Sequence, residues 1–186
     1  MVSLAALALP ILVAAVLVFL ASSVIHMVLP FHRSDWRRLP AEDRLLDAIR
    51  GLSIPPGDYF APHAASPDAM KNPEFIAKMQ KGPLVILTLA AGGSTSMGRN
   101  LAMWFVYILG VSIFAAYITG RALGPGASYL EVFRFAGATA FAGYSFALFQ
   151  NSIWYRRNWT ATIKSAADGL VYALLTAGAF GWLWPR

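Results

Sequence analysis

The chain has 186 residues, of which 58% are hydrophobic and only 13% are charged, and its mean hydropathy is +0.56. A soluble domain is about 45–50% apolar and about 25% charged, so this composition excludes an ordinary soluble or disordered protein. The absence of cysteine excludes disulfides, Cys-bound zinc, iron–sulfur clusters and thiol catalysis. The formal charge of +6 indicates membrane topology and not nucleic-acid binding, because basic residues flank the apolar segments.

The first apolar segment covers residues 1–29 and contains no Lys, Arg, Asp or Glu. It exceeds the roughly 20 residues that a helix needs to cross the hydrocarbon core. No basic residue precedes its apolar run, and that run is longer than the apolar part of a signal peptide. We therefore expect an uncleaved first membrane helix over 1–29, which ends at Pro30.

A polar insert follows, over residues 30–99. A short helix is predicted over 40–50, where Pro suits the first helical position and Gly51 ends the pattern. A second short helix is predicted over 72–82, and the β-branched run 84–89 has the composition of a strand. This strand is too short to cross a membrane and can pair with the extended stretch 54–61.

Three further apolar segments predict membrane helices over 100–120, 128–150 and 166–184. The glycine-rich run 92–98 lacks the ending of a phosphate-binding loop, so we interpret it as a connector into the second span. A second polar loop, 151–165, separates the last two spans.

Basic residues indicate the orientation of these spans. Those close to span ends are concentrated in the insert 30–99 and in the loop 151–165: Arg33, Arg37, Arg38, Arg99, Arg156, Arg157 and Lys164. Cytoplasmic loops carry such an excess, so we predict that both polar segments are cytoplasmic and that both termini lie outside.

Small residues recur every three or four positions in the last two spans: Gly169, Ala173, Ala177 and Gly181 in one, and Gly137, Ala140, Gly143 and Ala147 in the other. Small residues on one face allow the backbones of two helices to approach closely. We therefore expect the third and fourth spans to pack face to face.

Aromatic and basic residues gather at the ends of the fourth span: Trp154, Tyr155, Arg156, Arg157, Trp159, Trp182 and Trp184. Trp and Tyr are enriched at membrane interfaces, so we interpret this group as interfacial anchors.

Two histidines lie six residues apart around a proline, at His26 and His32. Together with His63 or Asp35 they form a candidate ligand set for a metal ion, and haem ligation is a further possibility for the imidazoles. An unbroken helix does not present residues six apart on one face, and the alternative is that His26 merely reaches the interface.

Three charged residues lie in or beside the later spans. Glu131 and Arg134 are three positions apart, so on a helix they can form an ion pair or line an access gate for an ion. Asp168 begins the fourth span, where it can stabilise the helix dipole or accept a proton or cation.

Three segments of the sequence, 25–36, 56–63 and 168–185, resemble a group of small, uncharacterised bacterial membrane proteins with four spans. The resemblance covers the whole chain. It implies a location in the bacterial inner membrane and supplies no activity, cofactor or catalytic residue.

The sequence thus predicts an all-α integral membrane protein, a four-helix bundle with a small α+β cytoplasmic insert between helices 1 and 2. We expect a scaffold or accessory subunit that binds the bilayer and another membrane protein or a second copy, without nucleic acid and without a cofactor. No catalytic constellation is present, so an enzyme is not expected. The alternatives are a small transporter or an ion or proton pathway formed by an oligomer, and a metal- or haem-binding membrane subunit.

Overall fold

The computed structural model describes residues 1–93 and 96–186. It divides into two compact units, a helical bundle formed by Met1–Arg37 and Ser96–Arg186, and an insert, Arg38–Thr95. The centre of the connector predicted over 92–98, residues 94–95, lies outside the described residues.

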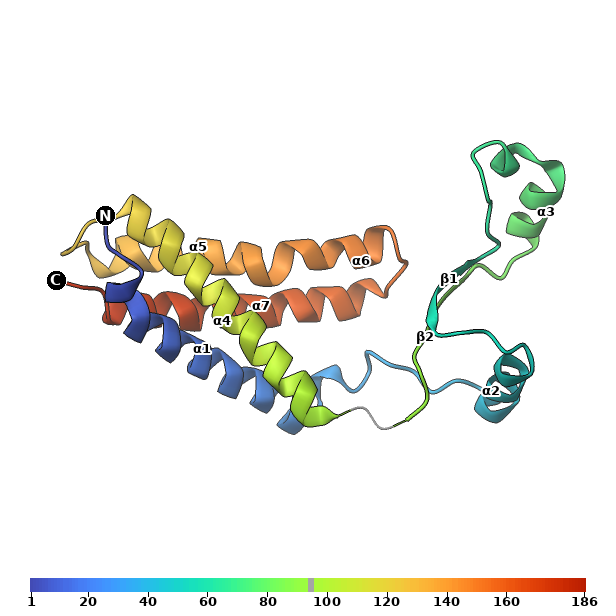
Figure 1. Ribbon diagram of the computed structural model, residues 1–186, viewed down its shortest axis with the longest axis horizontal. Coiled ribbons are helices and arrows are strands. Elements are labelled where there is room, and N and C mark those ends of the chain that lie inside the picture. The colour runs from blue at the N-terminus through green and yellow to red at the C-terminus, as the bar shows by residue number, and fades with distance from the viewer. Residues whose placement is uncertain (94–95) are drawn as a thin grey trace. The chain divides into compact units, whose positions relative to one another are not determined.

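The bundle is built from long helices that lie side by side (Figure 1). They are α1 (Ala8–Ser23), α4 (Met97–Ala122), α5 (Tyr129–Ser145) and α7 (Trp159–Trp182), with the short α6 (Phe149–Ile153) after α5. A capping box starts α5, because the Ser128 side chain accepts from Glu131 N and the Glu131 carboxylate accepts from Ser128 N.

Three helical segments are long and apolar enough to cross a membrane: Ala5–Val28, Met97–Ala122 and Tyr129–Ile153. The last of these joins α5 to α6 through one 3-10 turn. The predicted fourth span, α7, has 24 residues but does not meet the same criterion. It carries Lys164 and Asp168 in its first half, and these charges offset the apolar residues that follow.

Small residues allow α5 and α7 to approach closely. A Cβ atom on Gly137 would lie 3.0 Å from the Cβ atom of Ala177, and one on Gly181 would lie 2.7 Å from the ring of Tyr129. Gly169 lies against Ser145 at the other end of the pair. These contacts leave no room for larger side chains along this interface.

The expected stripe on the third span does not face a single partner. Gly137 lies against α7, whereas a Cβ atom on Gly143 would lie 3.2 Å from the side chain of Val111 on α4. Six residues turn a helix by about 600°, so the two glycines point in different directions and α5 serves two neighbours.

Both chain ends lie at the same end of the bundle (Figure 1). Val2 N donates to Gly120 O at 2.8 Å, and Gly126 N donates to Pro185 O at 2.9 Å. Both termini are therefore held next to the loop that joins α4 to α5, and α7 runs back along the length of the bundle.

The aromatic residues expected at the interfaces fall into two groups. Trp154, Tyr155, Trp159 and Trp182 are exposed on the surface. Trp184 is buried, its ring packs in the apolar core, and its indole N–H donates to Gly124 O at 3.0 Å. Trp184 thus packs against the protein itself, and its role as an interfacial anchor stays a prediction.

The insert contains α2 (Glu42–Gly51), α3 (Pro73–Lys81) and a two-stranded antiparallel sheet of β1 (Gly57–Ala61) and β2 (Val85–Leu89). In the sheet, Gly57 is paired with Leu89 and Ala61 with Val85. The pairing predicted between 84–89 and the stretch 54–61 is confirmed.

The insert has little interior of its own. No residue between 38 and 93 is buried, and Leu45 and Leu46 of α2 are exposed. An isolated two-stranded sheet is only marginally stable unless a further strand or a helix packs against it.

Candidate metal centre

The two histidines are brought together by an irregular end to the first membrane helix. His26 lies in a π-helical turn, Val24–Val28, closed by Leu29 N donating to Val24 O at 3.1 Å. Leu29 is extended, and Pro30–His32 forms a 3-10 turn that folds back. The imidazoles of His26 and His32 stack with ring centroids 4.4 Å apart, although their spacing in sequence does not suit a regular helix.

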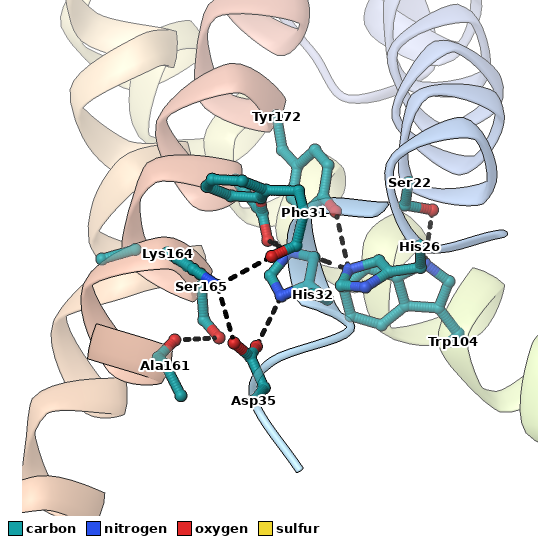
Figure 2. Close-up of polar contacts among 12 residues, drawn as sticks. Ser22, His26, Phe31, His32, Asp35, Trp104, Ala161, Lys164, Ser165 and Tyr172 are labelled. Carbon is teal, nitrogen blue, oxygen red and sulfur yellow. Dashed lines mark hydrogen bonds and ion pairs between the residues drawn. The ribbon is translucent and has the colours of Figure 1, made fainter. Parts of the chain in front are cut away.

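Lys164 of α7 fixes the segment that follows the histidines. Its Nζ atom donates to Phe31 O at 2.7 Å, to Ser34 Oγ at 2.8 Å and to Asp35 Oδ1 at 3.1 Å (Figure 2). A lysine ammonium has three N–H donors, so this side chain is fully used. Lys164 thereby holds the segment 31–35 against α7.

Asp35 orients His32. Its Oδ2 atom lies 2.7 Å from His32 Nδ1, on the side opposite the ion pair with Lys164. Burial alone would raise the pKa of Asp35, but the hydrogen bonds from His32 and Lys164 and the charge of Lys164 outweigh it, so the pKa is lowered. The ionised carboxylate accepts a hydrogen bond from Nδ1–H of His32. The other ring nitrogen, Nε2, is then available to a ligand or a metal ion.

Asp168, one helical turn after Lys164 on α7, faces that free nitrogen. Its Oδ2 atom lies 2.8 Å from His32 Nε2 and 3.9 Å from His26 Nε2. The three groups offer ligand atoms that all lie within 4.8 Å of one another. Asp168 is only 5% exposed, so its charge needs a partner.

His32 Nε2 and Asp168 Oδ2 have no hydrogen-bond partner among the described residues, although both are buried. They are close enough to bond but are not aligned as a hydrogen bond. When His32 donates from Nδ1 to Asp35 and is neutral, its Nε2 atom carries a lone pair, and a cation near Nε2 and the Asp168 carboxylate oxygen would satisfy both. Ligand atoms at this separation, each about 2.0–2.1 Å from an ion, subtend roughly 85–90°.

The other predicted residues are not part of this cluster. His63 belongs to the insert, which is a separate unit. Glu131 caps α5, and its carboxylate accepts hydrogen bonds from the backbone and side chain of Ser128. The ion pair expected between Glu131 and Arg134 does not form within the described part of the chain. Glu131 and Arg134 also lie about 20 Å along α5 from the end near Asp168.

An aromatic cavity of about 320 Å³ adjoins the cluster. It is lined by His26, Trp104, Tyr107, Tyr144, Leu148, Ser165, Asp168, Gly169 and Tyr172. The Tyr172 hydroxyl lies 3.4 Å from His26 Nε2, and Trp104 Nε1 donates to Ser22 Oγ at 2.9 Å (Figure 2). Sequence reasoning missed these aromatic residues, because they lie on three different helices, α4, α5 and α7, and no spacing within one segment relates them.

Comparison with protein families, with curated proteins and with solved structures finds no match. Fold and site together define a helical protein with apolar, membrane-length helices and a partly buried His–His–Asp cluster. Haem fits this cluster poorly, because stacked imidazoles cannot approach an iron from opposite faces of a porphyrin.

Proposed function

We propose that this membrane protein binds one divalent transition-metal ion through His26, His32 and Asp168. The observation that carries the proposal is the buried contact between His32 Nε2 and Asp168 Oδ2, two ligand atoms that face each other without a hydrogen bond. Two imidazoles and a carboxylate suit Zn²⁺ or Fe²⁺. The carboxylate of Asp35 behind His32 is the usual outer partner of a metal-binding histidine.

His26 is the adjustable ligand. Its side chain is 49% exposed, whereas those of His32 and Asp168 are 14% and 7% exposed. A modest rotation of this freer ring brings its nitrogen within reach of an ion already held by the other two groups. Three protein ligands leave a coordination position for water or a small molecule, as in sites where the metal reacts or exchanges.

The test is the metal content of protein purified without chelator. We expect about one equivalent of Zn²⁺ or Fe²⁺ per chain by elemental analysis, and loss of that metal in His32→Ala and Asp168→Ala. Asp35→Asn keeps all three ligands but should weaken metal binding about 10- to 100-fold. His63→Ala is the matched control and should retain the metal. Equal metal content in His32→Ala and in the unaltered protein would refute the proposal.

We further propose that α7 is a fourth span and that the protein resides in a bacterial inner membrane with both termini outside. The contacts Val2–Gly120 and Gly126–Pro185 support the fourth span, since both chain ends then lie on one side. The basic residues of 30–99 and 151–165 and the resemblance stated above support the orientation and the location.

A role as scaffold or accessory subunit is the second candidate. The exposed apolar side chains of α2, Leu45 and Leu46, favour it because they are available to another membrane protein or a second copy. Leu45→Asp should then release a partner that co-purifies in mild detergent while the metal content is unchanged. The ion-pathway hypothesis has less support, because Glu131 and Arg134 do not lie near Asp168.

A further inference from the structure

Four aromatic rings beside the His–His–Asp cluster form a closed circuit. The ring centroids are 5.3 Å apart from Trp104 to Tyr107, 6.0 Å from Tyr107 to Tyr144, 5.5 Å from Tyr144 to Tyr172, and 6.1 Å from Tyr172 back to Trp104. Three of these ring pairs are T-shaped, with interplanar angles of 71°, 76° and 64°. The Trp104–Tyr107 pair is stacked, with an interplanar angle of 22°. The four rings thus pack against one another, and all four line the same cavity.

The space beside these rings also contains polar groups that lack a partner. The cavity has a volume of about 320 Å³, roughly ten times the volume of one water molecule in the liquid. Asp168 lines it with a buried carboxylate, and the buried Tyr144 hydroxyl finds no hydrogen-bond partner among the described residues. The cavity thus combines π faces with a negative charge.

We infer that this aromatic cavity binds an organic ammonium group. A cation within about 6 Å of an aromatic centroid is attracted by the ring quadrupole, and surrounding rings add their attractions. A carboxylate at the edge of the rings supplies the balancing charge. A neutral ligand is a poorer fit, because it makes no charge interaction with the Asp168 carboxylate that lines the cavity when no metal ion is bound there.

The inference stands on the rings and does not require the metal. Asp168 is common to the cavity and to the proposed metal centre, but His32 is not among the residues that line the cavity, and Tyr107 is not among the proposed ligands. Variants at these two positions therefore separate the two sites. Two sources of an ammonium group are available to a membrane protein: the ethanolamine or choline head group of a phospholipid, and a free amine.

The decisive experiment compares choline with 3,3-dimethyl-1-butanol, which has the same shape but no charge. Each is titrated into the full-length protein in a zwitterion-free detergent, with binding followed by calorimetry. We expect choline to bind at least tenfold more tightly than the alcohol. Equal binding of the two, or preference for the alcohol, would show an apolar pocket and overturn the inference.

Paired variants at Tyr107 show whether the rings are responsible. Tyr107 is 44% exposed, and its hydroxyl donates to Gly143 O at 2.8 Å, so Tyr107→Phe removes only this hydrogen bond and keeps the ring. Tyr107→Leu should weaken choline binding roughly 3- to 30-fold, whereas Tyr107→Phe should not. An equal loss in both variants would contradict the inference.

The choline titration, together with metal analysis of His32→Ala and Tyr107→Leu, separates the aromatic cavity from the metal site. His32→Ala should lose the metal and keep its preference for choline, and Tyr107→Leu should do the reverse. Loss of choline preference in His32→Ala, with the thermal midpoint of unfolding unchanged, would mean that the metal centre and not the aromatic cavity selects the ligand.

Native mass spectrometry distinguishes the source of the ammonium group. The protein is exchanged into a mixture of phosphatidylethanolamine, phosphatidylcholine and phosphatidylglycerol, the last of which carries no ammonium group. Retention of the first two over the third, with displacement by choline, identifies a lipid head group as the ligand. Choline binding without such lipid preference identifies a free amine.

Discussion

Lys164 shows how much a single side chain determines at this site. Its three donated hydrogen bonds position Asp35, and Asp35 in turn fixes the tautomer of His32. His26 and Asp168 could be singled out in the sequence because ionisable groups within a predicted span are rare, and His32 because it lies six residues after His26. Lys164 could not, since a lysine at the end of a span is commonplace and its partners lie about 130 residues earlier in the chain.

Replacing this lysine should be costly. The side chains of Lys164 and Asp35 are only 16% and 7% exposed, and removal of one partner leaves the other charge buried. We expect Lys164→Met to lower the free energy of unfolding by about 3–5 kcal/mol, measured by denaturation in detergent. Lys78→Met is the control: it breaks an ion pair with Glu74 whose side chains are more than half exposed, and should have little effect.

Asp35 should make stability depend on pH in the acid range. Its pKa in the folded protein is below the ordinary value of 3.8, so the folded state favours the ionised carboxylate. This contribution is present above the ordinary value and is lost as the pH falls through the lowered pKa. The difference in thermal midpoint between the unaltered protein and Asp35→Asn should shrink as the pH falls below 3.8. A difference that grows on acidification would contradict this assignment.

At the scale of helices, the small residues of α7 were a better guide than those of α5. The stripe at four-residue spacing stays near one face because four residues make slightly more than one turn, and Ala177 and Gly181 both meet α5. Gly137 and Gly143 are separated by six, a spacing that cannot keep one face. Which helix a given face meets depends on how the helices pack in three dimensions, and the spacing of residues within one helix does not show this.

The α5–α7 interface should not tolerate bulk. Ala177 is fully buried and would lie 3.0 Å from a Cβ atom on Gly137, so Ala177→Ile forces the helices apart. We expect a loss of about 1–3 kcal/mol in the free energy of unfolding. Gly110→Ala on α4 is the control, because nothing lies within 4 Å of its added Cβ atom. That change should be neutral or stabilising by up to about 1 kcal/mol, through helix propensity alone.

For the whole molecule, composition and hydropathy predicted membrane helices, and the structure supplies three that qualify. The aromatic cavity was not predictable, because its residues come from three helices and no spacing within one segment relates them. The burial of Trp184 was not predictable either, because its contacts with Gly124 and the apolar core come from parts of the chain far away in sequence.

The topology makes a prediction for the intact protein. If α7 crosses the membrane, a reporter fused after Arg186 and one inserted within residues 64–70 should report opposite sides. The C-terminal reporter should be active outside the cytoplasm, and the inserted reporter inside. The same side for both would mean that α7 does not cross, in agreement with its lower apolarity.

The π-helical turn at Val24–Val28 has a consequence for how the chain tolerates length changes. A π turn contains one residue more than an α turn, so deleting Met27 would restore regular winding and swing all that follows by about 100° around the helix axis. The membrane-crossing part of α1 would be unaffected, yet His32 would point away from Asp168. We expect this single-residue deletion to abolish metal retention while leaving membrane insertion intact, as measured by elemental analysis and membrane fractionation. Replacing Met27 by another apolar residue keeps the length of this turn, so it should disturb metal retention far less than the deletion.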